Sequence, residues 1–125
     1  MWNEYDRNVW GGGVEGIVAK VSVLPTEVGD LVEQAGASLA AGRAALGVLY
    51  LHASSAATAP DWLDRLRALA GRRGGSAVVV KASPTLENRI DVWGELPGSR
   101  SLMRAVKTRF DPNGILNPGG GPGGL

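Results

Sequence analysis

Apolar and polar residues alternate with a period of two along residues 14–24. Ile17, Ala19 and Val21 fall on one side of this alternation, and Lys20 falls on the other. A period of two is typical of a half-buried β-strand. The pattern therefore predicts a first strand with Lys20 on its more polar face.

The residues after this strand have helical spacing. Thr26 is a candidate N-cap for a helix that Gly42 would end. The apolar positions of this helix recur every three or four residues: Val28, Leu31, Val32, Ala35 and Leu39. Residues 44–53 then form an apolar run with few polar side chains, which predicts a second strand in the middle of a covered sheet.

A second helix is predicted after Thr58. A capping threonine, a proline in the first turn and an acid three residues after the cap are typical of a helix start, and Thr58, Pro60 and Asp61 supply them. Glycines at 74–75 would close this helix. The β-branched run at residues 76–82 predicts a third strand.

A short extended stretch at residues 89–93 and a last helix are predicted before Asp111 and Pro112. We expect one apolar face of this helix to seal the core: Leu102, Met103, Val106 and Phe110. Residues 117–125 are mostly glycine and proline and predict an irregular tail. The order of elements predicts an α+β fold with one small sheet and helices on one face.

Composition and charge narrow the class of protein. A chain of 125 residues makes one small domain. Its 13 basic and 12 acidic residues give a formal net charge of +1, whereas nucleic-acid binding calls for a clustered basic excess. The absence of cysteine and the single histidine exclude thiolate sites and two-histidine metal sites. We therefore expect no nucleic-acid partner and no bound metal.

The sequence also lacks the features of a targeting signal. The polar start at residues 1–7 lacks a basic and then apolar leader, and the longest apolar run, residues 44–51, is far below the ~20 residues that cross a bilayer. We therefore expect a cytoplasmic protein with no transmembrane segment.

Three polar residues fall within predicted strands and are candidates for chemistry. A strand lysine such as Lys20 or Lys81 either extends to solvent or faces a ligand carboxylate. His52, late in the second strand, could act on a substrate or simply cover the end of the sheet. Lys20 and His52 are thus substrate-binding candidates, and no catalytic residue can be named.

Glycines 11, 13 and 16 match the spacing G-x-G-x-x-G. This spacing cradles a dinucleotide pyrophosphate only between a strand and the N-terminus of a helix. Here a strand follows the glycines and none is predicted before them. We therefore interpret residues 11–16 as a flexible connector.

The C-terminal part carries the most specific signal. Residues 110–119 read Phe-Asp-Pro-Asn-Gly-Ile-Leu-Asn-Pro-Gly and follow the last predicted helix. This stretch resembles the C-terminal signature of FAD-linked oxidases of the vanillyl-alcohol-oxidase type. Residues 22–25 and 91–94 look similar to corresponding points in the FAD-binding subunit of bacterial glycolate oxidase.

The resemblance implies a fold, a cofactor and partners. Residues 1–116 would be a ferredoxin-like cap, or substrate, domain, and residues 117–125 its tail. Such a cap packs over the flavin and forms one wall of a pocket for a small 2-hydroxy acid such as glycolate. FAD would be held mainly by an FAD-binding domain that these residues do not contain. Other glycolate oxidase subunits would be partners too, and through them the chain could lie at the inner membrane.

The resemblance also implies a cofactor-binding role for Asn117. Pro118 predicts an extended backbone at Asn117, and Gly119 permits a turn directly after it. The two apolar residues before Asn117 should dock on protein. Asn117 would then contact the cofactor or partner domain, or else form only a local turn. The family usually has a basic residue after Asn-Pro-Gly, where this chain has Gly120.

A second class of function fits the same features. The chain could be a non-catalytic α+β interaction module whose tail docks on a partner. Under either hypothesis, we expect the chain alone to be inactive as an oxidase.

Overall fold

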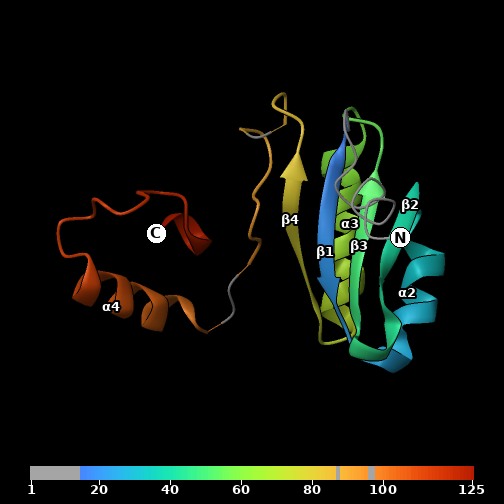
Figure 1. Ribbon diagram of the computed structural model, residues 1–125, viewed down its shortest axis with the longest axis horizontal. Helices are drawn as coiled ribbons and strands as arrows, with labels where there is room; N and C mark the ends of the chain where they lie inside the picture. The colour runs from blue at the N-terminus through green and yellow to red at the C-terminus, as the bar shows by residue number, and fades with distance from the viewer. Residues whose placement is uncertain (1–14, 87, 96–97) are drawn as a thin grey trace. The chain divides into compact units, whose positions relative to one another are not determined.

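Four strands form one antiparallel sheet in the described part of the chain. The computed structural model describes residues 15–86, 88–95 and 98–125, in two compact units that divide between Val92 and Trp93 (Figure 1). The strands are β1 (Ile17–Ser22), β2 (Leu39–Arg43), β3 (Val48–Ala53) and β4 (Ser76–Ala82). They pair in the order β2-β3-β1-β4, and all three pairings are antiparallel.

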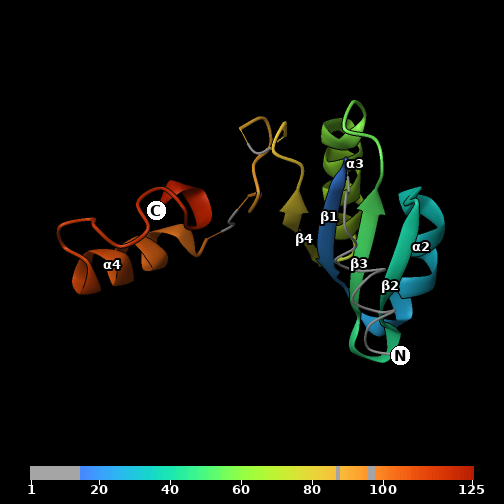
Figure 2. The ribbon, with the colours of Figure 1, turned by 45° about the horizontal axis from the view of Figure 1, so that its top comes forward.

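Two helices connect the strands of this unit. Helix α2 (Val28–Ala35) joins β1 to β2, and helix α3 (Ala59–Arg72) joins β3 to β4 (Figure 2). The resulting order β-α-β-β-α-β, with β1 and β3 in the centre of the sheet, is the ferredoxin-like arrangement. The prediction of an α+β fold of this type is confirmed.

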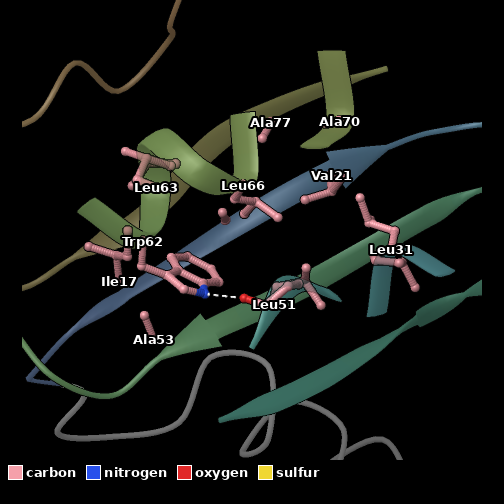
Figure 3. Packing of buried hydrophobic residues seen from close by; sticks show 14 of the residues in the cluster. Ile17, Val21, Leu31, Leu51, Ala53, Trp62, Leu63, Leu66, Ala70 and Ala77 are labelled. Atoms are coloured by element: carbon pink, nitrogen blue, oxygen red, sulfur yellow. Dashed lines mark hydrogen bonds between the residues drawn. The ribbon is translucent and has the colours of Figure 1, made fainter. Parts of the chain in front are cut away.

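The core lies between the sheet and these two helices. One side of β1, with Ile17 and Val21, packs with Leu31 of α2 and Leu66 of α3 in a single buried cluster (Figure 3). The indole Nε1 of Trp62 donates a hydrogen bond of 2.7 Å to the carbonyl oxygen of Ala35 at the end of α2 (Figure 3). Because the residues of both helices enter the same cluster, both helices cover the same face of the sheet.

The helix after β1 differs from its prediction at both ends. A 3₁₀ turn, Pro25–Glu27, precedes α2, and Glu27 rather than Thr26 occupies the N-cap position. The helix ends at Ala35 because Gly36 adopts the left-handed conformation, with φ of 60°. The predicted continuation to Gly42 is therefore wrong.

The predicted strand over residues 44–53 is also wrong in its first half. Ala44–Leu46 forms a 3₁₀ turn, and Gly47 has a φ of 67° before β3 begins. A Cβ atom at Gly47 would come 1.8 Å from the carbonyl oxygen of Val23, so the chain approaches too closely for any side chain here. This turn creates the hairpin between β2 and β3.

The second half of the sheet unit agrees better with the predictions made from the sequence. Helix α3 and strand β4 match their predictions, although Thr58 makes no side-chain capping hydrogen bond. The stretch at residues 89–93 forms turns and bends instead of an extended segment. Within it, the carbonyl oxygen of Val92 accepts a hydrogen bond of 2.9 Å from the amide of Val79. Most of the predicted glycine connector, residues 11–14, lies outside the described residues.

The C-terminal unit contains helix α4 (Arg100–Phe110), as predicted. The expectation that its apolar face seals the core is wrong. Leu102 is 67% exposed and Phe110 is 80% exposed, and no residue of α4 is buried. The buried cluster takes its helical residues from α2 and α3 instead, and these already cover the apolar face of the sheet.

Candidate functional site

Strand pairing brings the candidate lysines and the histidine to one face of the sheet. Val18 pairs with His52 of β3 on one side and with Lys81 of β4 on the other. Lys20 pairs with Tyr50 of β3, two residues along. Paired residues share a face, and the alternation along β1 puts this face opposite the one that packs on the helices. Lys20 and His52 are therefore diagonal neighbours on the same face.

We call this surface the lysine face and define it by its strand positions. They are Val18, Lys20, Ser22, Leu39, Ala41, Arg43, Val48, Tyr50, His52, Ser76, Val78 and Lys81. Among these described positions there are three permanent cations, at Lys20, Arg43 and Lys81, and no Asp or Glu. Val18 and His52 are buried on this face, whereas Lys20 and Arg43 are exposed. The exposed part of the face around these two cations attracts anions, including small carboxylic acids.

Lys20 and His52 differ in how they reach this surface. Lys20 is exposed, whereas His52 is only 6% exposed. The backbone of His52 is fixed by Ser38, whose amide and hydroxyl both donate to the His52 carbonyl oxygen, at 2.8 and 3.0 Å. Lys20 can therefore meet a ligand directly, while His52 lies within the protein surface beside it.

The second group of candidate residues is in the turn after α4, which we call the C-terminal turn (residues 111–120). Asp111, which is 7% exposed, makes the hydrogen bonds that hold this turn together. One carboxylate oxygen of Asp111 accepts a hydrogen bond from the amide of Ile115 at 3.0 Å, and the other accepts one from the amide of Leu116 at 3.0 Å. The ammonium group of Lys107 pairs with the second oxygen at 2.8 Å and also donates to the carbonyl oxygen of Leu116.

These contacts fix the charge of Asp111. The hydrogen bond from Lys107, followed by those from the amides of Leu116 and Ile115, holds the pKa of the carboxyl below its ordinary value of 3.8, although burial acts in the opposite direction. Sequence reasoning missed this role. The available signal was the four-residue spacing from Lys107 to Asp111, which lets a helical lysine reach a carboxylate one turn later.

Asn117 does not have the extended backbone that Pro118 predicts. Its φ is 44°, in the left-handed region that asparagine tolerates better than most residues. A tight turn begins at Asn117, closed by a hydrogen bond of 3.1 Å from the amide of Gly120 to the carbonyl oxygen of Asn117. Gly119, with φ of 74°, permits the turn as predicted. Asn117 is exposed, as are Ile115 and Leu116 before it.

The helix starts of the sheet unit do not fit the pyrophosphate of FAD. Such a group needs free amides at a helix start, but both connections that leave the sheet for a helix place a proline there, Pro25 before α2 and Pro60 in α3. Proline has no N–H to donate. The starts of α2 and α3 are therefore not suited to hold the phosphates of FAD.

Two kinds of site can be tested in the part of the chain that the structure describes, namely metal sites and membrane-spanning helices. Residues 15–86, 88–95 and 98–125 contain no group of three His, Asp or Glu side chains arranged to hold a metal ion. No helix within these same ranges is long and apolar enough to cross a membrane.

The fold and these sites define a ferredoxin-like α+β protein with a cationic sheet face and a C-terminal helix and turn. Residues 97–120 match the family model of the FAD linked oxidases, C-terminal domain. The match covers 24 of the 125 residues and includes all of α4 and the C-terminal turn. No curated protein and no solved structure matches the chain. The match supports the C-terminal domain of an FAD-linked oxidase, a family whose members use FAD.

Proposed function

We propose that the chain is the C-terminal cap domain, or a fragment of it, of a subunit of an FAD-dependent 2-hydroxy-acid oxidase or dehydrogenase, with glycolate as the type substrate. The observation that carries this proposal is the match of residues 97–120 to the C-terminal domain of FAD linked oxidases. The sheet supports it, because helices cover one face and the other presents cations to an anionic substrate.

The lysine face then forms one wall of the substrate pocket. The ammonium group of Lys20 binds the substrate carboxylate, and Arg43 and Lys81 add to the positive potential of the same face. His52 borders Lys20 and limits the pocket on that side. The flavin supplies the redox chemistry of such oxidases, while the protein orients the substrate.

The proposal includes partners for the chain. An FAD-binding domain holds the cofactor, and other glycolate oxidase subunits complete the assembly in the cytoplasm. Asn117 contacts the cofactor or that domain from its exposed turn. Because the starts of α2 and α3 lack a pyrophosphate cradle, we expect the purified chain to bind no FAD. Flavin that copurifies with it in stoichiometric amount would contradict this expectation.

The experiment combines the 125-residue chain with an FAD-linked oxidase truncated before its own C-terminal domain. Oxidation of glycolate is followed by reduction of a dye. Lys20→Gln should raise the KM for glycolate by ~10-fold or more, because a hydrogen bond to a charged group contributes about 1.5–3 kcal/mol. Arg72→Gln, at an exposed position of α3, is the matched control and should leave the KM unchanged.

Two outcomes would contradict the proposal. If Lys20→Gln and Arg72→Gln behave alike, then Lys20 does not bind the substrate. If the chain binds the truncated oxidase but restores no oxidation of any 2-hydroxy acid, then it acts as a non-catalytic interaction module.

A further inference from the structure

A cavity lies at the end of the sheet where the hairpin joins β2 to β3. It has a volume of about 250 Å³ and is lined by five residues around the hairpin: Gly42, Arg43, Leu46, Val48 and Tyr50. We call it the hairpin cavity. Arg43, Val48 and Tyr50 are also positions of the lysine face. The hairpin cavity therefore lies beside the surface on which Lys20 is placed.

Much of the wall of the hairpin cavity is apolar. Leu46, Val48 and the ring of Tyr50 line it, and Leu46 is 64% exposed although its side chain is large and apolar. Concave apolar surfaces with a few polar groups at their edge are typical of sites for small molecules. Glycolate has no side chain that could cover these walls. The cavity fits an acid that carries an apolar group.

The volume of the hairpin cavity sets the size of that group. An apolar cavity of about 150 Å³ in another protein holds one benzene molecule. With about 250 Å³, the hairpin cavity has room for a group of about six carbon atoms, such as a phenyl ring or a branched alkyl chain.

Two cations flank the hairpin cavity. Arg43 lines it, and Lys20 of β1 pairs directly with Tyr50, which also lines it. The Cβ atoms of directly paired residues are about 4.5–5.5 Å apart, so Lys20 starts next to a wall of the cavity. Within the described part of the chain, the side chains of Lys20 and Arg43 form no ion pair or hydrogen bond. Both charges are therefore available to a carboxylate at the edge of the cavity.

The backbone fixes the shape of the hairpin cavity without a ligand. The amide of Gly47 donates to the carbonyl oxygen of Ala44 at 3.0 Å, and the carbonyl oxygen of Gly47 accepts from the amide of Val23 at 2.9 Å. A Cβ atom at Gly42 would collide with the carbonyl oxygen of Val48, so β2 and β3 approach closely here. A cavity that is formed beforehand lowers the cost of binding.

We propose that the acid bound by the lysine face carries an apolar side chain of about six carbon atoms, which lies in the hairpin cavity while the flanking cations hold the carboxylate. This inference rests on the proposed function, because it names the class of 2-hydroxy acid that the same site accepts. Glycolate would then be a poor ligand.

Binding to the 125-residue chain tests the proposal directly. In a titration with phenyllactate, the amide resonances of Leu46, Val48 and Tyr50 should shift to saturation. Glycolate at the same concentrations should leave them in place. Phenylethanol has the ring but no carboxylate, and it should bind ~10-fold more weakly or worse, because it loses the hydrogen bonds to charged groups.

A pair of variants tests the apolar wall. Leu46→Ser should weaken the binding of phenyllactate by at least ~5-fold, because it removes apolar surface from the cavity. Leu24→Ser is the matched control, since Leu24 is 63% exposed in the same unit and does not line the cavity. The control should bind phenyllactate like the unchanged chain, and circular dichroism should show the same sheet unit in both variants.

Three results of these titrations would overturn the inference. Phenyllactate causes no saturable shift at the three cavity amides, or glycolate binds as tightly as phenyllactate does. Alternatively, Leu46→Ser and Leu24→Ser bind phenyllactate alike, which places the ring outside the hairpin cavity.

Oxidation by the chain combined with the truncated FAD-linked oxidase separates this inference from the proposed function. The kcat/KM for phenyllactate should exceed that for glycolate by ~10-fold or more, since one methylene in an apolar pocket already changes this constant about 10–200-fold. Leu46→Ser should narrow the ratio. Oxidation that favours glycolate would support the proposed function and overturn this inference. Binding of phenyllactate that depends on Leu46, without oxidation of either acid, would support this inference and contradict the proposed function.

Discussion

The side-chain amide of Asn117 lies against Gly120. A Cβ atom at Gly120 would fall 2.4 Å from Nδ2 and 2.6 Å from Oδ1 of Asn117, closer than a real Cβ contact. The backbone of the same two residues is joined by the hydrogen bond that closes the turn. The position of the Asn117 amide therefore depends on the absence of a side chain at residue 120.

Asn117→Gly tests whether this amide binds the cofactor or the partner domain. Glycine keeps the left-handed backbone, so the turn remains and only the amide is lost. In the chain assembled with the FAD-binding part, flavin retention should weaken by ~10-fold, because a polar partner left unsatisfied costs about 1–3 kcal/mol. Ultrafiltration of the assembled protein measures the released flavin.

Asn113→Gly, in the same turn and also exposed, is the control and should retain flavin normally. The stability of the 125-residue chain should stay within ~0.5 kcal/mol for both variants, as for most surface substitutions. If Asn117→Gly instead destabilises the chain and leaves flavin retention intact, the residue is only a structural turn.

Gly120→Ala should reproduce the effect of Asn117→Gly by another route. The added Cβ collides with the end of a flexible side chain, so the Asn117 amide moves aside while the fold adjusts at low cost. The double variant should release no more flavin than either single variant, because the two changes remove the same contact. Additive losses would show that Gly120 and Asn117 act independently.

The fold could be predicted from the sequence where local signals agree with tertiary packing. Strand β4 and helix α3 have clear propensity, period and breakers, and both were predicted. Strand β2 was missed because its sequence, Leu-Ala-Ala-Gly-Arg, has little strand propensity and continues the apolar spacing of α2. Pairing with β3 makes it a strand, and the left-handed Gly36 separates it from the helix.

The candidate site was only partly visible in the sequence for a similar reason. The strand lysine and histidine could be named, but their common face depends on the register between β1 and β3. These strands are separated in the chain by α2 and β2, so no local turn reveals how they pair. The hydrogen bonds of Asp111 depend on how the backbone returns toward the carboxylate after Pro112. No periodic pattern of apolar and polar residues predicts this path of the backbone.

Phe110→Ala should leave the free energy of unfolding of the isolated chain within ~0.5 kcal/mol of its original value, because the ring is 80% exposed. Leu51→Ala provides the comparison, since Leu51 is fully buried in the core and its truncation should cost about 2–5 kcal/mol. Urea denaturation followed by circular dichroism measures both. A loss at Phe110 as large as that at Leu51 would show that α4 contributes to the core.

Two glycines should respond to alanine in opposite directions. Gly47→Ala should destabilise the sheet by at least ~2 kcal/mol, because φ is 67° and the Cβ would collide with the backbone of Val23. Gly29→Ala should stabilise by about 0.5–1 kcal/mol, since Gly29 is within α2 and its Cβ would meet no neighbour within 4 Å. Thermal unfolding of the two variants checks both signs. Equal melting temperatures would contradict the tight hairpin at Gly47.

The C-terminal turn should lose stability in acid. The hydrogen bond from Lys107 and those from the amides of Leu116 and Ile115 lower the pKa of Asp111 in the folded chain below 3.8. A lowered folded pKa contributes stability that is fully present above the unfolded value and is lost as the pH falls through the folded value. We therefore expect the turn to be intact above about pH 5 and to open as the pH falls below 3.8.

The amide resonances of Ile115 and Leu116 should shift together with a midpoint below 3.8. Lys107→Met should raise that midpoint, because the Lys107 bond is the largest cause of the lowered pKa, and Asp111→Asn should abolish the transition. A midpoint at or above 3.8, or one that Lys107→Met leaves in place, would show that Lys107 does not hold this carboxylate in solution.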